Sequence, residues 1–149
     1  MTLKQRIHQH YLQAVQANMS RLQAVLADLK ESGANETKST AGDKHETALA
    51  MLQLEQEKVR KQMAEVMQQQ EAMNKLQPAT MHTKVAPGSL VKTDKGLLYV
   101  SIAAGKAVVD GYTVIALSPQ SPLGVQLLNL KAGQTARFNQ MNYFVESVE

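Results

Sequence analysis

Residues 48–77 read ALAMLQLEQEKVRKQMAEVMQQQEAMNKLQ, and the fold of the first half of the chain can be inferred from them. It contains no proline and no glycine, and residues that favour helices dominate it. Within it, one set of positions recurs at alternating spacings of three and four: Leu49, Leu52, Gln56, Val59, Met63, Val66, Gln70, Met73 and Gln77. This heptad spacing predicts one long helix that packs along a second helix through these positions, which we call the seam.

The partner helix is predicted upstream, because the same rhythm recurs there. Its seam positions are Tyr11, Val15, Asn18, Leu22, Val25 and Leu29. Between the two patterns, residues 32–43 read SGANETKSTAGD, a composition typical of a loop. We therefore expect helices over about 2–31 and 44–77. A short loop at 32–43 would make them an antiparallel coiled-coil hairpin over residues 1–77.

The second half of the chain has a different composition. All four prolines and six of the eight glycines lie in residues 78–149. This shift predicts a linker over 78–87 and a small β-rich domain over 88–149. Strands are expected at 90–93, 97–102, 107–109, 112–117, 135–138 and 143–148. Asp110-Gly111 suits a two-residue hairpin turn, and Ser121-Pro122 suits the start of a short helix. The predicted fold class is α+β, with the hairpin first.

Composition excludes several kinds of function. Lys and Arg exceed Asp and Glu only by 16 to 13, and aromatic residues are scarce, which argues against autonomous DNA binding. The absence of cysteine excludes disulfides and thiolate chemistry. The sequence has no apolar run long enough to span a membrane, and its first ten residues contain no apolar segment. We therefore expect a cytoplasmic protein without membrane contacts. Because no phosphate-binding loop or nucleophile motif is found, we predict that the chain is no enzyme by itself.

Two carboxylates could carry chemistry. Asp43 and Glu46 lie where the predicted loop enters the second helix, and their spacing places them on one helical face. Carboxylate oxygens are ligands that Mg²⁺ prefers, but two of them make an incomplete site, so the ion would be shared with a partner. The same pattern is also a capping box, in which both side chains bond to free backbone N–H groups at the helix start. Both interpretations stay open at this point.

Two motifs resemble those of the bacterial Gre-type transcript cleavage factors. Gly42-Asp43-x-x-Glu46 is similar to the family's tip signature. Ser121-Pro122-Leu123-Gly124, followed by Lys131-Ala132-Gly133, is similar to the signature of its C-terminal domain. The resemblance implies an FKBP-like C-terminal domain that docks on RNA polymerase at the rim of its secondary channel. Ser121, Pro122, Leu123 and Gly124 would belong to the docking domain.

The resemblance also implies a mechanism. The hairpin of these factors enters the secondary channel, and the tip acids help to hold the second Mg²⁺ of the polymerase. That ion activates a water that cuts the 3′ end of backtracked RNA. Asp43 and Glu46 would then assist catalysis and share the metal, stimulating the polymerase's own activity and touching the nascent RNA only indirectly.

The sequence also departs from the family pattern at the tip. Thr47 stands where the family usually has Asn, and Ala48 follows it where acidic or aromatic residues are usual. Two other functions therefore stay open: a channel-binding regulator that does not cleave RNA, and a coiled-coil adaptor that binds another protein.

Overall fold

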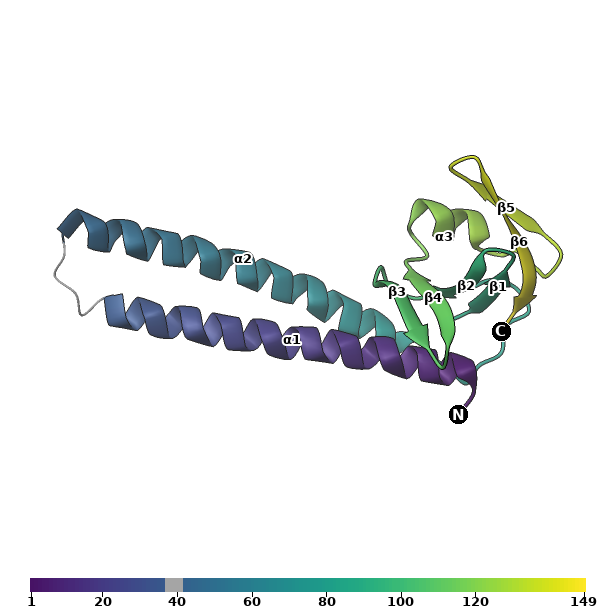
Figure 1. The fold of residues 1–149 in the computed structure, drawn as a ribbon, viewed down its shortest axis with the longest axis horizontal. Coiled ribbons are helices and arrows are strands. Elements are labelled where there is room, and N and C mark those ends of the chain that lie inside the picture. The colour runs from purple at the N-terminus through teal and green to yellow at the C-terminus, as the bar shows by residue number, and fades with distance from the viewer. Residues whose placement is uncertain (37–41) are drawn as a thin grey trace. The chain divides into compact units, whose positions relative to one another are not determined.

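The computed structural model describes residues 1–36 and 42–149, and describes side chains for all of these except residues 36 and 42–45. Two long helices, α1 (Leu3–Glu36) and α2 (Gly42–Lys75), precede a small domain of strands with one short helix (Figure 1). The chain divides into two compact units. The hairpin unit is Ala14–Gln70, and the sheet unit combines Met1–Gln13 with Glu71–Glu149.

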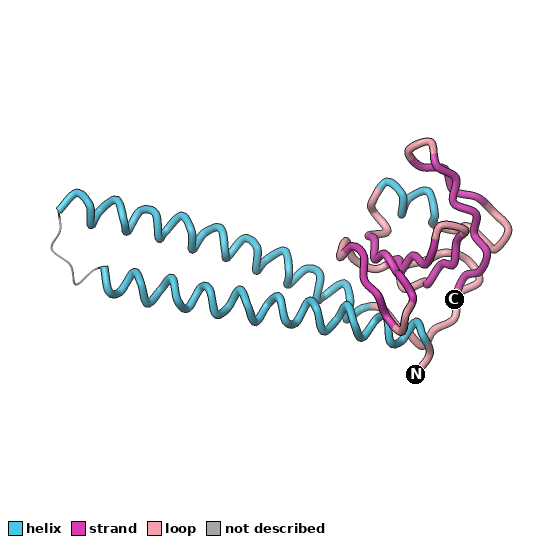
Figure 2. Tube along the Cα trace, in the orientation of Figure 1, coloured by secondary structure: helices cyan, strands magenta, loops and turns pink. Residues whose placement is uncertain are grey.

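The hairpin unit confirms the predicted seam. Its parts of α1 and α2 run side by side in opposite directions, as the helices in cyan show (Figure 2). Val15, Leu22, Val59 and Val66 are each at most 5% exposed. The other seam residues of this unit are partly buried. Packing of this apolar stripe supplies stability that isolated helices lack in water.

Both helices extend further toward their connection than the sequence predicted. The predicted loop covered residues 32–43, but α1 continues to Glu36 and α2 already begins at Gly42. Gly33, which favoured a loop, lies inside α1 with the Gln56 side chain 3.8 Å from the position of an added Cβ. A glycine costs a helix only about 1 kcal/mol. Packing against the partner helix therefore outweighs the local preference.

The sheet unit contains a six-stranded sheet. Its strands are β1 (Leu90–Thr93), β2 (Gly96–Val100), β3 (Gly105–Val109), β4 (Tyr112–Leu117), β5 (Thr135–Phe138) and β6 (Met141–Val148). Their order is β3-β4-β2-β1-β6-β5, in which β2 and β4 pair in parallel and the other neighbours pair antiparallel. Asp110 and Gly111 both have positive φ, 51° and 81°, as the predicted two-residue turn between β3 and β4 requires.

One face of the sheet is covered by the short helix α3 (Pro122–Leu127). The core comprises Val85, Val91, Leu98, Val100, Leu117, Leu127, Ala136 and Val145. Val85 lies in the predicted linker 78–87, yet it is 1% exposed. Its N–H donates to the Leu130 carbonyl, and its own carbonyl accepts from the Asn129 N–H, both at 2.8 Å. The second part of the predicted linker is therefore built into the domain.

The first turns of α1 also belong to the sheet unit. Ile7 and Tyr11 are buried there together with Val114 and Ala116 of β4. The predicted boundary near residue 78 therefore does not coincide with the division between the compact units, which cuts across both long helices. The α+β class, with a helical hairpin followed by a small β-rich domain, is confirmed. Within residues 1–36 and 42–149, every helix is too short or too polar to span a membrane.

Candidate functional site

The acidic pair predicted to carry chemistry lies at the beginning of α2. Because α2 begins at Gly42, the backbones of Asp43 and Glu46 are one helical turn apart and on the same side of the helix. The Glu46 side chain is exposed, whereas the Asp43 side chain lies outside the described residues. The capping box and the metal-binding pair therefore both stay predictions.

Asp43 and Glu46 lie at the end of the hairpin unit that is farther, along both helices, from residues 14 and 70. Both helices leave the unit at one end, near residues 14 and 70, and α1 ends and α2 begins at the other end, which we call the tip. Residues 14–36 of α1 span roughly 35 Å at 1.5 Å per residue. The backbones of Asp43 and Glu46 thus stand at the tip of a two-helix stalk.

A complete metal site is not found among the side chains that the structure describes. No three Asp, Glu or His residues of this part of the chain come together as potential ligands. Mg²⁺ takes six oxygen ligands and keeps several waters. Asp43 and Glu46 have the right donor chemistry, so they could hold such an ion together with ligands from another molecule.

The Ser121–Gly124 motif explains the start of α3. The Ser121 hydroxyl accepts from the Gly124 N–H at 3.0 Å and donates to the Ser118 carbonyl at 2.6 Å. Pro122 occupies the first turn, where its missing N–H costs nothing. At Gly124 an added Cβ would lie only 2.1 Å from the Ser118 oxygen, so the turn accepts no side chain there.

Only part of this motif faces solvent. Gly124 is buried, and Ser121 and Leu123 are partly buried, so these three shape and anchor the helix. Pro122 is exposed, and so is Val125, at 56%. If α3 takes part in docking, Pro122 and Val125 are the apolar residues available for contact. Sequence reasoning missed Val125, although its place one helical turn after the Ser121 cap was a usable signal.

Sequence reasoning also missed a buried polar cluster in the sheet unit. His8 Nδ1 lies 2.7 Å from the Tyr99 hydroxyl. The Lys4 ammonium donates to the Thr80 carbonyl at 2.5 Å, and the Tyr11 hydroxyl donates to the Gly105 carbonyl at 2.8 Å. Lys4, His8 and Tyr11 recur at spacings of four and three, which extends the seam rhythm toward the start of α1. Extending the seam rhythm in this way could have predicted that Lys4 and His8 are buried.

Burial sets the proton affinities of this cluster. It lowers the pKa of His8 below its ordinary 6.5 and raises the pKa of the Tyr99 phenol. Burial also lowers the pKa of Lys4, against a smaller opposing effect of the Glu149 charge. Lys4 bonds to Thr80, His8 to Tyr99 and Tyr11 to Gly105, so the cluster attaches the first turns of α1 to the rest of the sheet unit.

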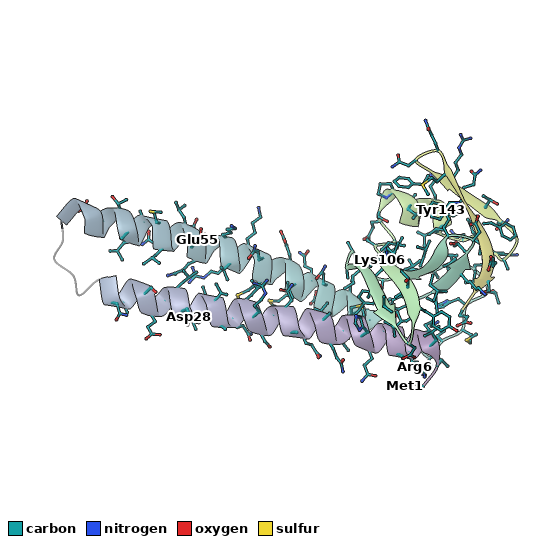
Figure 3. The ribbon with its side chains drawn as sticks, viewed as in Figure 1. Met1, Arg6, Asp28, Glu55, Lys106 and Tyr143 are labelled. Carbon is teal, nitrogen blue, oxygen red and sulfur yellow. The ribbon has the colours of Figure 1, made fainter. Side chains whose placement is uncertain are left out.

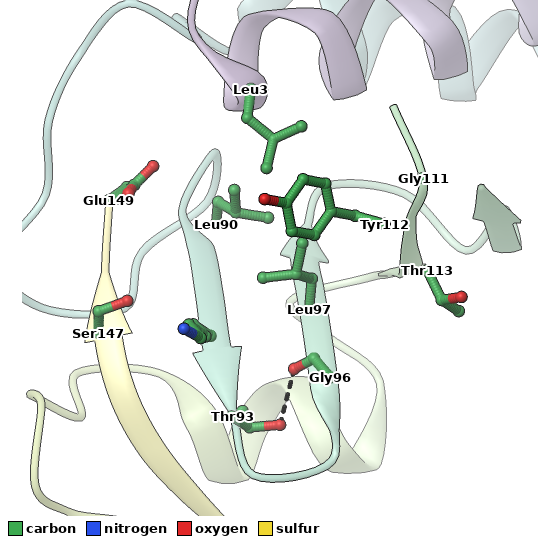
Figure 4. Close-up of a pocket in the computed structure, with 11 residues that line it drawn as sticks. Leu3, Leu90, Thr93, Gly96, Leu97, Gly111, Tyr112, Thr113, Ser147 and Glu149 are labelled. Carbon is green, nitrogen blue, oxygen red and sulfur yellow. Dashed lines mark hydrogen bonds between the residues drawn. The ribbon is translucent and has the colours of Figure 1, made fainter. Parts of the chain in front are cut away.

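The sheet unit also has an open groove of about 470 Å³ on the sheet face beside the start of α1 (Figure 4). Leu3, Leu90, Leu97 and Tyr112 give it apolar walls. Two of its polar side chains are already engaged: Thr93 donates to the Gly96 carbonyl at 2.8 Å, and the Lys92 ammonium lies 3.8 Å from the Glu146 carboxylate. Nothing in this lining selects one class of ligand.

Comparisons with known proteins add a distant structural likeness. No protein-family model and no curated protein sequence matches the chain. Among solved structures, one described as the structure of the transcription factor Gfh1 is similar over 92% of this chain and 92% of its own. The two chains are 14% identical, and the TM-score is 0.36. The likeness is too remote to place this chain in a family.

Proposed function

We propose that this protein regulates transcription elongation by binding RNA polymerase through its secondary channel. There Asp43 and Glu46 would help to hold an Mg²⁺ ion at the polymerase active site and so stimulate cleavage of backtracked RNA. One observation carries the proposal: an acidic pair with the family's tip spacing stands at the tip of an antiparallel helical hairpin. The other end of that hairpin continues into a β-rich unit.

The chemistry of the pair suits this role. A second divalent ion in such a site activates a water for attack on a phosphodiester. Asp43 and Glu46 would supply carboxylate oxygens to the ion, and the polymerase would supply the remaining ligands. The chain would then act as a stimulating factor and not as an enzyme by itself.

A second candidate is a channel-binding regulator that does not cleave RNA. It is favoured by Thr47 and Ala48, which replace the residues that usually follow the family's tip acids. Both candidates share the same contact with the polymerase and differ only in whether the tip takes part in chemistry.

The test is RNA cleavage in stalled, backtracked elongation complexes from the source organism. The combined change Asp43→Asn and Glu46→Gln removes both charges at nearly constant shape. The matched control, Glu55→Gln with Glu65→Gln, removes two exposed charges from the same helix away from the tip. Polymerase binding is measured in parallel for all three proteins.

We expect the tip variant to bind the polymerase and to lose at least tenfold in cleavage rate, or about 1.4 kcal/mol. The control should cleave like the parent protein. Binding by all three without cleavage by any would favour the non-cleaving regulator. Absence of binding by the parent protein would reject both candidates and leave the adaptor.

A further inference from the structure

The seam of the hairpin unit is repetitive. Most of its members are Val, Leu or Met, whose side chains are similar in size and all apolar. If one helix slipped by a heptad along the other, most apolar residues would again face apolar residues. Apolar burial is nondirectional, so it only weakly distinguishes the observed register from such a slip.

Gln56 is the exception in the part of the seam nearest the tip. It is partly buried, and its Nε2 donates across the hairpin to the backbone carbonyl of Leu29 at 3.5 Å. Gly33 lies one turn after Leu29 and has no side chain to cover that carbonyl. An added Cβ at Gly33 would lie 3.8 Å from the same Nε2 atom. A Cβ at that distance would make ordinary contact with the amide, so only a side chain longer than that of alanine could cover the Leu29 carbonyl.

A slip of one heptad toward the start of α1 would lose this arrangement. A slip of one heptad would carry Gln56 from Leu29 toward Leu22. The residue one turn after Leu22 is Leu26, which is partly buried and would cover the carbonyl. An amide buried without a partner is costly, so the slipped arrangement is penalised. Gly33 is the single glycine of α1.

We propose that Gln56 and Gly33 together set the register of α1 against α2 near the tip. Gln56 is thus a positioning residue, and it acts through the backbone of Leu29. A polar residue in an apolar seam is a known means of specifying register at some cost in stability. With the register set, the start of α2 has one fixed place relative to the end of α1. One consequence rests on the proposed function: the same contact would position Asp43 and Glu46 for the shared ion.

The native chain contains no cysteine, so spin labels attach only at cysteines that are introduced by substitution. The distance between two such labels reports the register of the two helices. Spin labels are attached at Asp28→Cys on α1 and Glu55→Cys on α2, two exposed sites labelled in Figure 3. Pulsed electron paramagnetic resonance then gives the distribution of distances between them in the full-length protein. A slip of one heptad moves one label by about 10 Å along the helix axis.

In the otherwise native protein we expect one narrow distance. Gln56→Leu should add a second distance or broaden the first, and it should also raise the melting temperature. Gly33→Leu, which covers the Leu29 carbonyl, should change the distances in the same way. Gln53→Leu makes the same substitution at an exposed position of α2 and should leave the distances unchanged.

An unchanged single distance in Gln56→Leu would overturn the proposal. If the melting temperature of that variant also fell, the contact between Gln56 and Leu29 would be a merely stabilising one. Both measurements use the free protein, so they stand whether or not the chain binds RNA polymerase. If the proposed function holds, Gln56→Leu should also reduce RNA cleavage while Gln53→Leu does not.

Discussion

At the scale of single residues, the sheet unit depends on a histidine kept neutral. His8 is 8% exposed and bonded to the hydroxyl of Tyr99, which is fully buried. Burial lowers the pKa of His8, so the folded protein binds a proton at this site less tightly than the unfolded chain does. Protonation therefore favours unfolding.

The consequence is a predicted loss of stability in mild acid. The contribution of neutral His8 is complete above pH 6.5, the ordinary pKa, and is lost as the pH falls through the lowered pKa of the folded state. His8→Gln keeps a hydrogen-bonding side chain without this titration. The free energy of unfolding, measured by denaturant titration between about pH 5 and pH 7, should decline less in His8→Gln than in the parent protein.

His10→Gln is the matched control, since His10 is exposed two residues further along α1. It should keep the parent profile. Some decline should remain in both variants, because burial and the Lys4 charge also lower the pKa of His82. Identical pH profiles for His8→Gln and the parent protein would show that His8 does not titrate with unfolding.

At the scale of elements, the hairpin unit is stabilised through its seam and not through its outer surface. Leu22 of α1 is 2% exposed, whereas Leu54 of α2 is 65% exposed. Leu22→Ala should destabilise the helices by about 2–5 kcal/mol, since it removes buried methyl groups and leaves a cavity. Leu54→Ala should change stability by about 0.5 kcal/mol or less.

The measurement is thermal and denaturant unfolding followed by the helical signal in circular dichroism. Equal effects of the two leucine substitutions would contradict the observed packing of the hairpin unit. The comparison needs no partner molecule, because both residues lie within that unit.

At the scale of the whole molecule, the compact units do not follow the composition change at residue 78. Tyr99, Val114 and Ala116 are at most 3% exposed in a sheet unit that includes the first turns of α1. A chain in which a short Gly/Ser linker replaces residues 14–70 keeps the whole sheet unit. It should fold cooperatively. The fragment 78–149 lacks the α1 turns and residues 71–77, which include the buried Met73, and it should be less stable and should bind a dye that reports exposed apolar surface.

Nuclear magnetic resonance spectra and denaturant unfolding compare these two shortened chains directly. If the fragment 78–149 proved as stable as the linked sheet unit, the contacts of the α1 turns and of residues 71–77 would be unimportant for the stability of the sheet. Loss of folding in both chains would instead mean that the sheet unit requires the hairpin unit.

Local patterns predicted much of this fold. The strands at 90–93, 112–117 and 135–138 have their predicted bounds, because turn residues such as Asp110 and Gly111 end each run of strand formers. The Ser121 cap was also predicted, since capping requires only residues within one turn. The predictions were less accurate at Gly33 and Val85, where contacts with distant residues outweigh the local preference.

The amino-acid sequence was enough to predict the helical rhythm, the seam, the succession of strands along the chain and the tip spacing of Asp43 and Glu46, because these follow from side-chain type and short-range spacing. It did not predict how the strands are ordered in the sheet. Tertiary structure alone decided that His8 would be buried against Tyr99, that Gln56 would reach the Leu29 carbonyl, and that the start of α1 would belong to the sheet unit. A polar side chain far from its partner in sequence gains its role only when folding removes water and supplies that partner.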